Sequence, residues 1–274
     1  MIGIFSENNN PIIRGPQKVF LNLIKGFDLL KVEYEINKIC DLNGCLNSYR
    51  QYFDILPNNT LMGPNLVVNP IDDLNLFTKF NKFLVPSNLV KNNYFKFDLN
   101  SNVNIHTHAT GIDTEFWNEQ EKNITKDCLI YFKNRTDLEL ELLKKTLNKI
   151  NISYYIIKYG YYNEEDLKQK LSEVKFCLLL TGTESQGIGY MEILSTNTPC
   201  FVFNFIYDDG KLYGESIPYF NKNCGFVYNG KIENSEDELI AFLNSLATFS
   251  PREFIVNDFT LEKSANKYIE LLKK

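Results

Sequence analysis

Short apolar runs alternate along the chain with longer segments whose apolar residues recur three or four positions apart. In the first half, the apolar run Ile2–Phe5 is followed by a polar loop and then by apolar residues at helical spacing from Val19 to Phe27, which predicts a strand, a loop and a helix. Pro86-Ser87 is a typical helix start. Further strands are expected over Tyr34–Cys40, Phe53–Leu56, Lys82–Val85 and Val103–His106, and Leu61–Val68 holds a Gly-Pro-Asn turn between apolar residues.

The second half repeats this alternation. Strands are expected over Cys128–Phe132, Ile152–Lys158, Phe176–Leu180 and Pro199–Phe205. Helices are expected over Leu138–Ile150, Glu164–Val174 and Thr260–Leu272, and another begins within Gly189–Ser195. Strands that alternate with helices are typical of an α/β fold with parallel sheets.

The two halves predict two doubly wound domains, residues 1–117 and 118–274. The polar segment Asn118–Lys126 has the composition of a linker. The last helix is expected either to stay with the second domain or to pack back on the first.

Composition excludes several classes of protein. The net charge of −5 argues against a general nucleic-acid binder, which needs a basic surface to neutralise phosphates. No apolar run approaches the roughly 18–20 residues that span a bilayer. Six scattered cysteines without a CxxC pair, only two histidines and no basic leader favour a cytoplasmic protein without a zinc site.

The stretch Leu178–Asn204 carries the strongest chemical signal. A buried strand leads into a polar loop, and a helix follows. Ligands of open α/β sheets bind beyond the carboxyl ends of the strands, which is where this loop is expected. Gly187 and Gly189 allow close backbone approach, and the amides at the start of the helix suit a phosphate. Glu184 and Glu192, with seven residues between them, supply carboxylates for sugar or ribose hydroxyls.

This stretch resembles the Glu-x7-Glu signature of retaining family-4 glycosyltransferases of GT-B fold. Thr198-Pro199-Cys200 stands where that family usually has Gly-x-Pro-Val, with Asn197 in the place of the glycine. Gly111–Thr114 resembles the turn that leads into the second domain of the family, and Arg14–Lys18 resembles the loop after its first strand.

The resemblance implies two Rossmann-like domains facing across a cleft, and a donor held mainly by the second. Its expected catalytic residues are Lys133 and Arg135, as contacts for the donor diphosphate, and Glu184. The family usually has a further lysine in a Lys-Gly pair, where this chain has Thr136-Asp137-Leu138, so Arg135 takes that role. The expected donor-binding residues are Glu192, Gly187, Ile188, Gly189, Gly15 and Tyr159.

The resemblance further implies transfer of a sugar, with retention of configuration, from a nucleotide-sugar donor to a glycan, lipid or protein acceptor. No cofactor and no metal is expected, nor a nucleic-acid partner. His106 and His108 lie on one face of their strand, but two ligands alone make a poor metal site.

Each candidate also has an ordinary structural interpretation. The glutamates could belong to a loop or a helix surface, the basic residues to a strand end or a helix start, and the glycines to simple turns. Tyr159 could stack on a nucleobase or pack against protein. Two other functions stay open: a nucleotide-sugar epimerase, disfavoured by the scarcity of histidine, and a non-catalytic module that binds a sugar or a partner.

Overall fold

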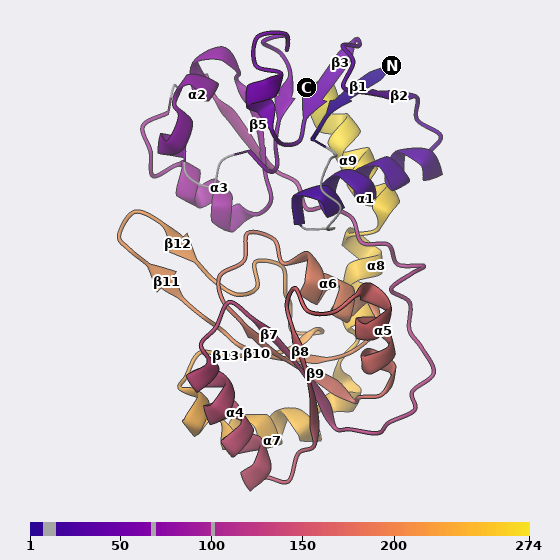
Figure 1. The fold of residues 1–274 in the computed structure, drawn as a ribbon, viewed down its shortest axis with the longest axis vertical. Coiled ribbons are helices and arrows are strands. Elements are labelled where there is room, and N and C mark those ends of the chain that lie inside the picture. Colours follow the sequence, from indigo (N-terminus) through magenta and orange to yellow (C-terminus); the bar gives the residue numbers. More distant parts are fainter. Residues whose placement is uncertain (8–14, 67–69, 100–101) are drawn as a thin grey trace. The chain divides into compact units, whose positions relative to one another are not determined.

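The computed structural model describes residues 1–7, 15–66, 70–99 and 102–274. It divides into two compact α/β units (Figure 1). The first unit comprises residues 1–112, 210–212 and 258–274, and the second comprises 113–209 and 213–257.

The first unit is built on a six-stranded parallel sheet. The strand order is β2-β1-β3-β4-β5-β6, and every neighbouring pair is parallel. The strands are β1 (Ile2–Phe5), β2 (Tyr34–Ile36), β3 (Leu42–Cys45), β4 (Leu61–Met62), β5 (Lys82–Val85) and β6 (Asn104–Thr107). The helices are α1 (Gly15–Leu29), α2 (Asn75–Lys79), α3 (Asn88–Tyr94) and α9 (Leu261–Lys273).

Helices cover both faces of this sheet because successive strand residues point to opposite sides. Ile4 belongs to a core that includes Phe27 of α1 and Tyr268 of α9, whereas the next residue, Phe5, belongs to a second core with Phe77 of α2. The C-terminal helix α9 therefore completes the fold of the N-terminal unit.

The second unit contains a five-stranded parallel sheet and a short antiparallel hairpin. The sheet order is β13-β10-β9-β7-β8. Its strands are β7 (Cys128–Lys133), β8 (Tyr154–Lys158), β9 (Phe176–Thr181), β10 (Cys200–Phe203) and β13 (Gly225–Tyr228). The hairpin pairs β11 (Tyr207–Asp208) with β12 (Tyr213–Gly214). The helices are α4 (Asp137–Lys149), α5 (Glu164–Ser172), α6 (Ile188–Ser195), α7 (Glu236–Asn244) and α8 (Pro251–Asp258).

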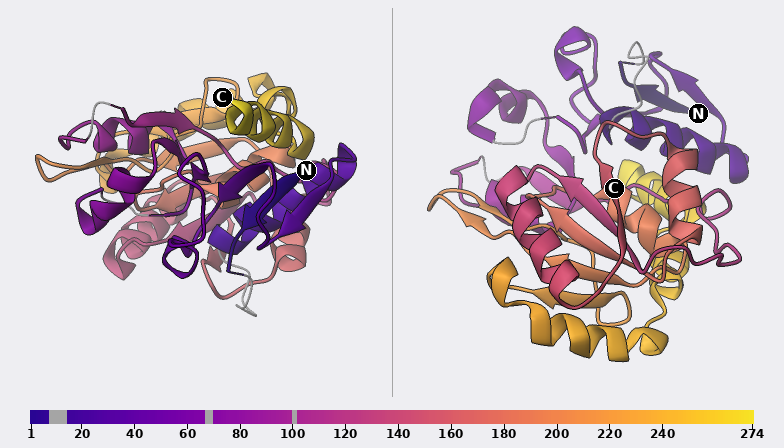
Figure 2. Two further views of the ribbon diagram at one scale, coloured as in Figure 1. Left: turned by 90° about the horizontal axis from the view of Figure 1, so that it is seen from above. Right: turned by 60° about the horizontal axis from the view of Figure 1, so that its bottom comes forward.

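The sheet of the second unit also has a core on each face. Leu143 and Leu147 of α4 join Leu239 and Phe242 of α7 in one core, together with alternate strand residues such as Ile130. Helices α5 and α6 lie on the other side of the sheet (Figures 1 and 2). Leu129, Tyr131 and Lys133, which alternate with the residues of the first core, therefore point to the side of α5 and α6.

The predicted α/β class is confirmed, and most predicted strands lie within two residues of the observed ones. Two strand predictions were wrong. Phe53–Leu56 is a turn, in which Ile55 is 61% exposed. Strand β3, earlier in the chain, was not predicted because its sequence LNGC is short and half polar. The strand expected over Tyr34–Cys40 ends at Ile36, after which Asn37 adopts a positive φ of 56°.

Candidate functional site

The carboxyl ends of the central strands of the second unit gather most of the predicted site residues. Lys133 is the last residue of β7 and pairs in register with Thr181, the last residue of β9. The amide of Gly182 donates to the carbonyl of Lys133 at 2.8 Å, which holds the two strand ends together. The loop after β9 then carries Glu184 and leads into α6.

Lys133 and Glu184 form an ion pair at this edge. The Lys133 Nζ atom lies 2.6 Å from Glu184 Oε1, and the two side chains are only 16% and 11% exposed. The amide of Glu184 donates to the carbonyl of Glu215 at 2.8 Å, which fixes the loop. Burial raises the pKa of Glu184, and the nearby Lys133 opposes that rise. A partly buried cation beside a carboxylate is a suitable receptor for a ligand that carries both phosphate and hydroxyl groups.

Tyr159 completes the surroundings of the cation. Its ring centroid lies 4.3 Å from Lys133 Nζ, a cation–π distance, and its amide donates to the carbonyl of Phe132. The residue is 40% exposed. Tyr159 is thus brought to the same strand edge as Lys133 and Glu184, partly accessible to solvent.

Tyr131 connects the two glutamates of the motif. Burial, the hydroxyl of Tyr162 and the charges of Glu184 and Glu192 all raise the pKa of Tyr131, with burial the largest cause. The hydroxyls of Tyr131 and Tyr162 lie 3.1 Å apart. Glu192 lies within α6 and is 3% exposed. The negative charges of both glutamates thus contribute to the raised pKa of this one buried phenol.

Packing explains the two glycines at the start of α6, of which Gly187 precedes the helix and Gly189 is its second residue. Gly187 has a φ of 82°, and a Cβ atom there would lie 1.9 Å from the ring of Tyr190. A Cβ atom on Gly189 would lie 2.6 Å from the hydroxyl oxygen of Tyr131. Ile188 is the first residue of α6, whose first amides have no partner within the helix. Packing alone requires these two glycines, so the predicted contact of residues 187–189 with a phosphate stays a prediction.

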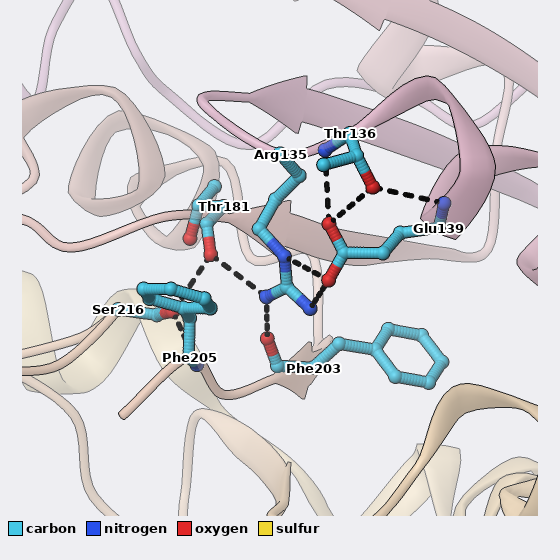
Figure 3. Close-up of polar contacts among 7 residues, drawn as sticks. All are labelled: Arg135, Thr136, Glu139, Thr181, Phe203, Phe205 and Ser216. Carbon is cyan, nitrogen blue, oxygen red and sulfur yellow. Dashed lines mark hydrogen bonds and ion pairs between the residues drawn. The ribbon is translucent and has the colours of Figure 1, made fainter. Parts of the chain in front are cut away.

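Arg135 has a structural role in the network shown in Figure 3. Its Nη1 donates to the carbonyls of Thr181 and Phe203 at 3.1 and 3.0 Å, and its Nε donates to Glu139 at 2.8 Å. Nη2 lies 2.6 Å from the same carboxylate, and the side chain is only 7% exposed. These contacts use four of the five guanidinium N–H donors, so Arg135 joins the ends of β9 and β10 to the start of α4.

Two predicted residues lie in the first unit or outside the described residues. Gly15 is the first residue of α1, and a Cβ atom there would meet nothing within 4 Å. Arg14, in the loop that resembles the family, lies outside the described residues.

The two histidines belong to the first unit. His106 lies on β6, and His108 follows it with its Nε2 atom 3.0 Å from the carbonyl of Ser264. Burial lowers the pKa of His108 to about 4. Within residues 1–7, 15–66, 70–99 and 102–274, no three His, Cys, Asp or Glu side chains are grouped as metal ligands.

Sequence reasoning missed Tyr131 and considered Tyr162 only as part of the aromatic run Tyr159–Tyr162, for stacking on a nucleobase. A usable signal existed for Tyr131: it stands two positions before Lys133 and therefore faces the same side of the strand. Tyr162 follows a strand end in an aromatic run, and only the path of its loop brings its hydroxyl to Tyr131.

Comparisons with known proteins show the fold. No protein-family model matches this sequence, and no curated protein matches it. Among solved structures, sucrose-phosphate synthase from Thermosynechococcus elongatus is similar over 99% of this chain and 98% of its own, at 9% identity and a TM-score of 0.63. The lipopolysaccharide outer core galactosyltransferase WaaB, in its apo form, is similar over 100% and 99%, at 12% identity and a TM-score of 0.62.

A third similar structure, TarM, is longer than this chain. The similarity covers 93% of this chain and 58% of TarM, at 15% identity and a TM-score of 0.60. These neighbours are GT-B glycosyltransferases, so the two α/β units constitute a GT-B fold. In the described residues, no helix is long and apolar enough to cross a membrane.

Proposed function

We propose that this chain is a glycosyltransferase that moves a sugar from a nucleoside-diphosphate sugar to an acceptor. The observation that carries the proposal is the partly buried Lys133–Glu184 pair at the carboxyl edge of a parallel sheet, in a chain of GT-B fold. Two of the similar structures are named as a galactosyltransferase and a sucrose-phosphate synthase, which supports sugar transfer as the reaction class.

Lys133 is the proposed electrophilic group. When the bond between the anomeric carbon and the diphosphate oxygen breaks, negative charge grows on the leaving diphosphate, and a fixed cation stabilises it. The amides of Ile188 and Gly189 at the start of α6 would add dipolar stabilisation. The acceptor hydroxyl forms the new bond to the anomeric carbon and gives its proton to the departing phosphate oxygen. Attack from the face that the diphosphate leaves would retain the configuration of the sugar.

Glu184 is the proposed contact for the donor sugar, and Glu192 for the ribose. A carboxylate held at 11% exposure accepts strong hydrogen bonds from sugar hydroxyls. Glu184 also neutralises Lys133 before the donor arrives, so the cation need not be buried alone. Tyr159 supplies an exposed aromatic face for the nucleobase. We propose that Arg135 positions the strand ends and does not contact the diphosphate, since most of its donors are occupied.

The test compares Lys133→Met and Glu184→Gln with a matched ion-pair variant at the other end of the same sheet. Lys175 Nζ lies 2.8 Å from Asp127 Oδ1, beside the amino ends of β7 and β9, so Lys175→Met removes a similar pair far from the proposed chemistry. A panel of UDP-, GDP- and dTDP-sugars would first be screened for thermal stabilisation of the chain, since a ligand of the native state raises its melting temperature. Release of nucleoside diphosphate from the best donor would then be measured.

We expect Lys133→Met to lower turnover by about 10²–10³-fold, the usual effect of removing one transition-state contact, and Lys175→Met to leave it unchanged. Equal activity of Lys133→Met and the wild type would refute the assignment. Tight donor binding to the wild type without any diphosphate release would instead favour a second candidate function, a non-catalytic binding module. The absence of the family's second lysine is the sequence feature that supports this alternative.

A further inference from the structure

A groove of about 680 Å³ lies in the second unit, apart from the Lys133–Glu184 pair. Its wall includes β13, an edge strand of the sheet, and the segment that runs from β12 towards that strand. None of its lining residues is one of the residues proposed above for the donor. The proposed function therefore leaves this groove without a role.

Oriented amide groups form one side of the groove. The amide of Ser216 donates to Asn204 Oδ1 at 3.1 Å, and Asn204 Nδ2 donates to Asn229 Oδ1 at 2.9 Å. This sequence of hydrogen bonds fixes which way each carboxamide is turned. Both asparagines line the groove, and no hydrogen bond of Asn229 Nδ2 is found within the described part of the chain. These hydrogen bonds thus end at the Nδ2 N–H groups of Asn229, which can donate to a ligand.

Glu215 provides an acceptor in the same lining. Its carbonyl receives the amide of Glu184, so its backbone is fixed, but its carboxylate has no hydrogen bond or ion pair among residues 1–7, 15–66, 70–99 and 102–274. Partial burial raises the pKa of Glu215, and no other cause contributes. A half-buried carboxylate without a protein partner is costly, and it is a strong acceptor for a hydroxyl group of a ligand.

Aromatic surface completes the lining. Phe226 of β13 is 39% exposed, and it stacks on the buried Phe201 with ring centroids 5.4 Å apart and an interplanar angle of 27°. The core therefore holds one ring face in place while the rest of the side chain is exposed beside the polar groups. Tyr213 and Phe220 also line the groove.

We propose that this groove binds a neutral saccharide at a site separate from the donor. A polyol presents both donors and acceptors, which match the carboxylate of Glu215 and the N–H groups of Asn229, and its apolar C–H face packs on an aromatic ring such as Phe226. An anion is disfavoured, because the positive charge of Lys222 in the lining is balanced by the negative charge of Glu215. The inference goes beyond the proposed transfer reaction, since it concerns a different set of residues.

The experiment is saturation-transfer NMR on the full chain with lactose, cellobiose and N,N′-diacetylchitobiose, three neutral disaccharides, at millimolar concentration. We expect signals from the sugar ring protons of at least one disaccharide. Phe226→Ala should weaken its affinity by about tenfold. Glu215→Gln, which keeps the size of the side chain, tests the same site should Phe226→Ala fail to fold, and it should also weaken binding.

Lys133→Met separates this inference from the proposed function. It should leave the disaccharide signal unchanged while it lowers turnover of the donor. The inference is overturned if no disaccharide binds, if binding survives in both groove variants, or if inorganic phosphate displaces the sugar. Loss of the signal in Lys133→Met together with its retention in Glu215→Gln would assign the sugar to the donor site instead.

Discussion

Replacement of Arg135 by methionine separates a structural arginine from a ligand-binding one. Methionine preserves most of the length and the apolar stem of the side chain but removes all its donors. Three acceptors are affected: the carbonyls of Thr181 and Phe203 and the carboxylate of Glu139 (Figure 3).

The expected loss of stability differs among these acceptors. The carbonyl of Thr181 keeps a hydrogen bond from Ser216 Oγ at 2.8 Å, so it stays satisfied. Glu139 keeps its bonds to Thr136 in the capping box of α4, and at 25% exposure its lost ion pair is worth at most about 1 kcal/mol. The carbonyl of Phe203 loses the donor on Arg135, at a cost of about 1–3 kcal/mol. The total is about 1–4 kcal/mol, chiefly from one backbone carbonyl.

Urea unfolding followed by tryptophan fluorescence measures this loss of stability in the second unit, to which Arg135 belongs. Trp117 is the only tryptophan of the chain, it is 2% exposed, and it belongs to the second unit. We expect a lower unfolding midpoint for Arg135→Met. In the control, Lys144→Met removes a surface ion pair with Glu141 on α4 and should leave the unfolding midpoint nearly unchanged.

Donor binding supplies the second readout for Arg135. Where Arg135 only positions the strand ends, the folded variant binds a nucleotide sugar nearly as well as the wild type under conditions that keep both native. Wild-type stability combined with a large loss of donor affinity would refute this interpretation and restore Arg135 as a contact for the diphosphate.

Three further predictions concern other parts of the chain. Gly26→Ala should destabilise the first unit by about 1–3 kcal/mol, because its Cβ would lie 2.6 Å from a carbonyl oxygen of α9; hydrogen exchange of the α1 amides measures this. In the control Gly15→Ala, the new Cβ has no atom within 4 Å and stability should not fall. His108 has a folded pKa of about 4 against an ordinary 6.5, so its contribution to stability is complete above pH 6.5 and falls by about 3 kcal/mol as the pH is lowered towards 4. His108→Gln should therefore show a flatter pH dependence of the unfolding free energy over that range. An unchanged slope would contradict the assignment. Gly189→Ala should lower donor turnover, since its Cβ collides with the Tyr131 hydroxyl, and Gly189→Ala/Tyr131→Phe should recover part of it; no recovery would show that the collision is not the cause.

The sequence by itself determined the α/β class and most of its elements. Parallel strands buried on both faces are nearly continuous apolar runs, and such runs, for example Phe176–Thr181, are unambiguous in a single sequence. Helix starts were equally readable, because the side chain of Ser87 accepts from the amide of Val90 as an N-cap residue should. These signals are local, so no knowledge of the remaining chain was needed.

The sequence also identified Lys133 and Glu184 as candidates but not as partners. They are separated by α4, β8, α5 and β9, and only the parallel register of β7 with β9 brings them to 2.6 Å. For Arg135, the sequence indicated a basic residue near the site but not its contacts with other parts of the protein. From sequence it is another basic residue beside a strand end, and only the positions of the Thr181 and Phe203 carbonyls and of Glu139 reveal that four of its five donors have protein partners.

Tertiary structure alone decided the elements and groups whose partners are distant. Strand β3 is short and polar, yet it lies within the sheet because Gly44 leaves room for the Tyr268 hydroxyl, which a Cβ atom would approach to 2.0 Å. The groove beside β13 joins residues from both sides of the hairpin, and no periodic pattern marks its members. Local propensity is set by neighbours in the chain, whereas packing and hydrogen-bond satisfaction are set by neighbours in space.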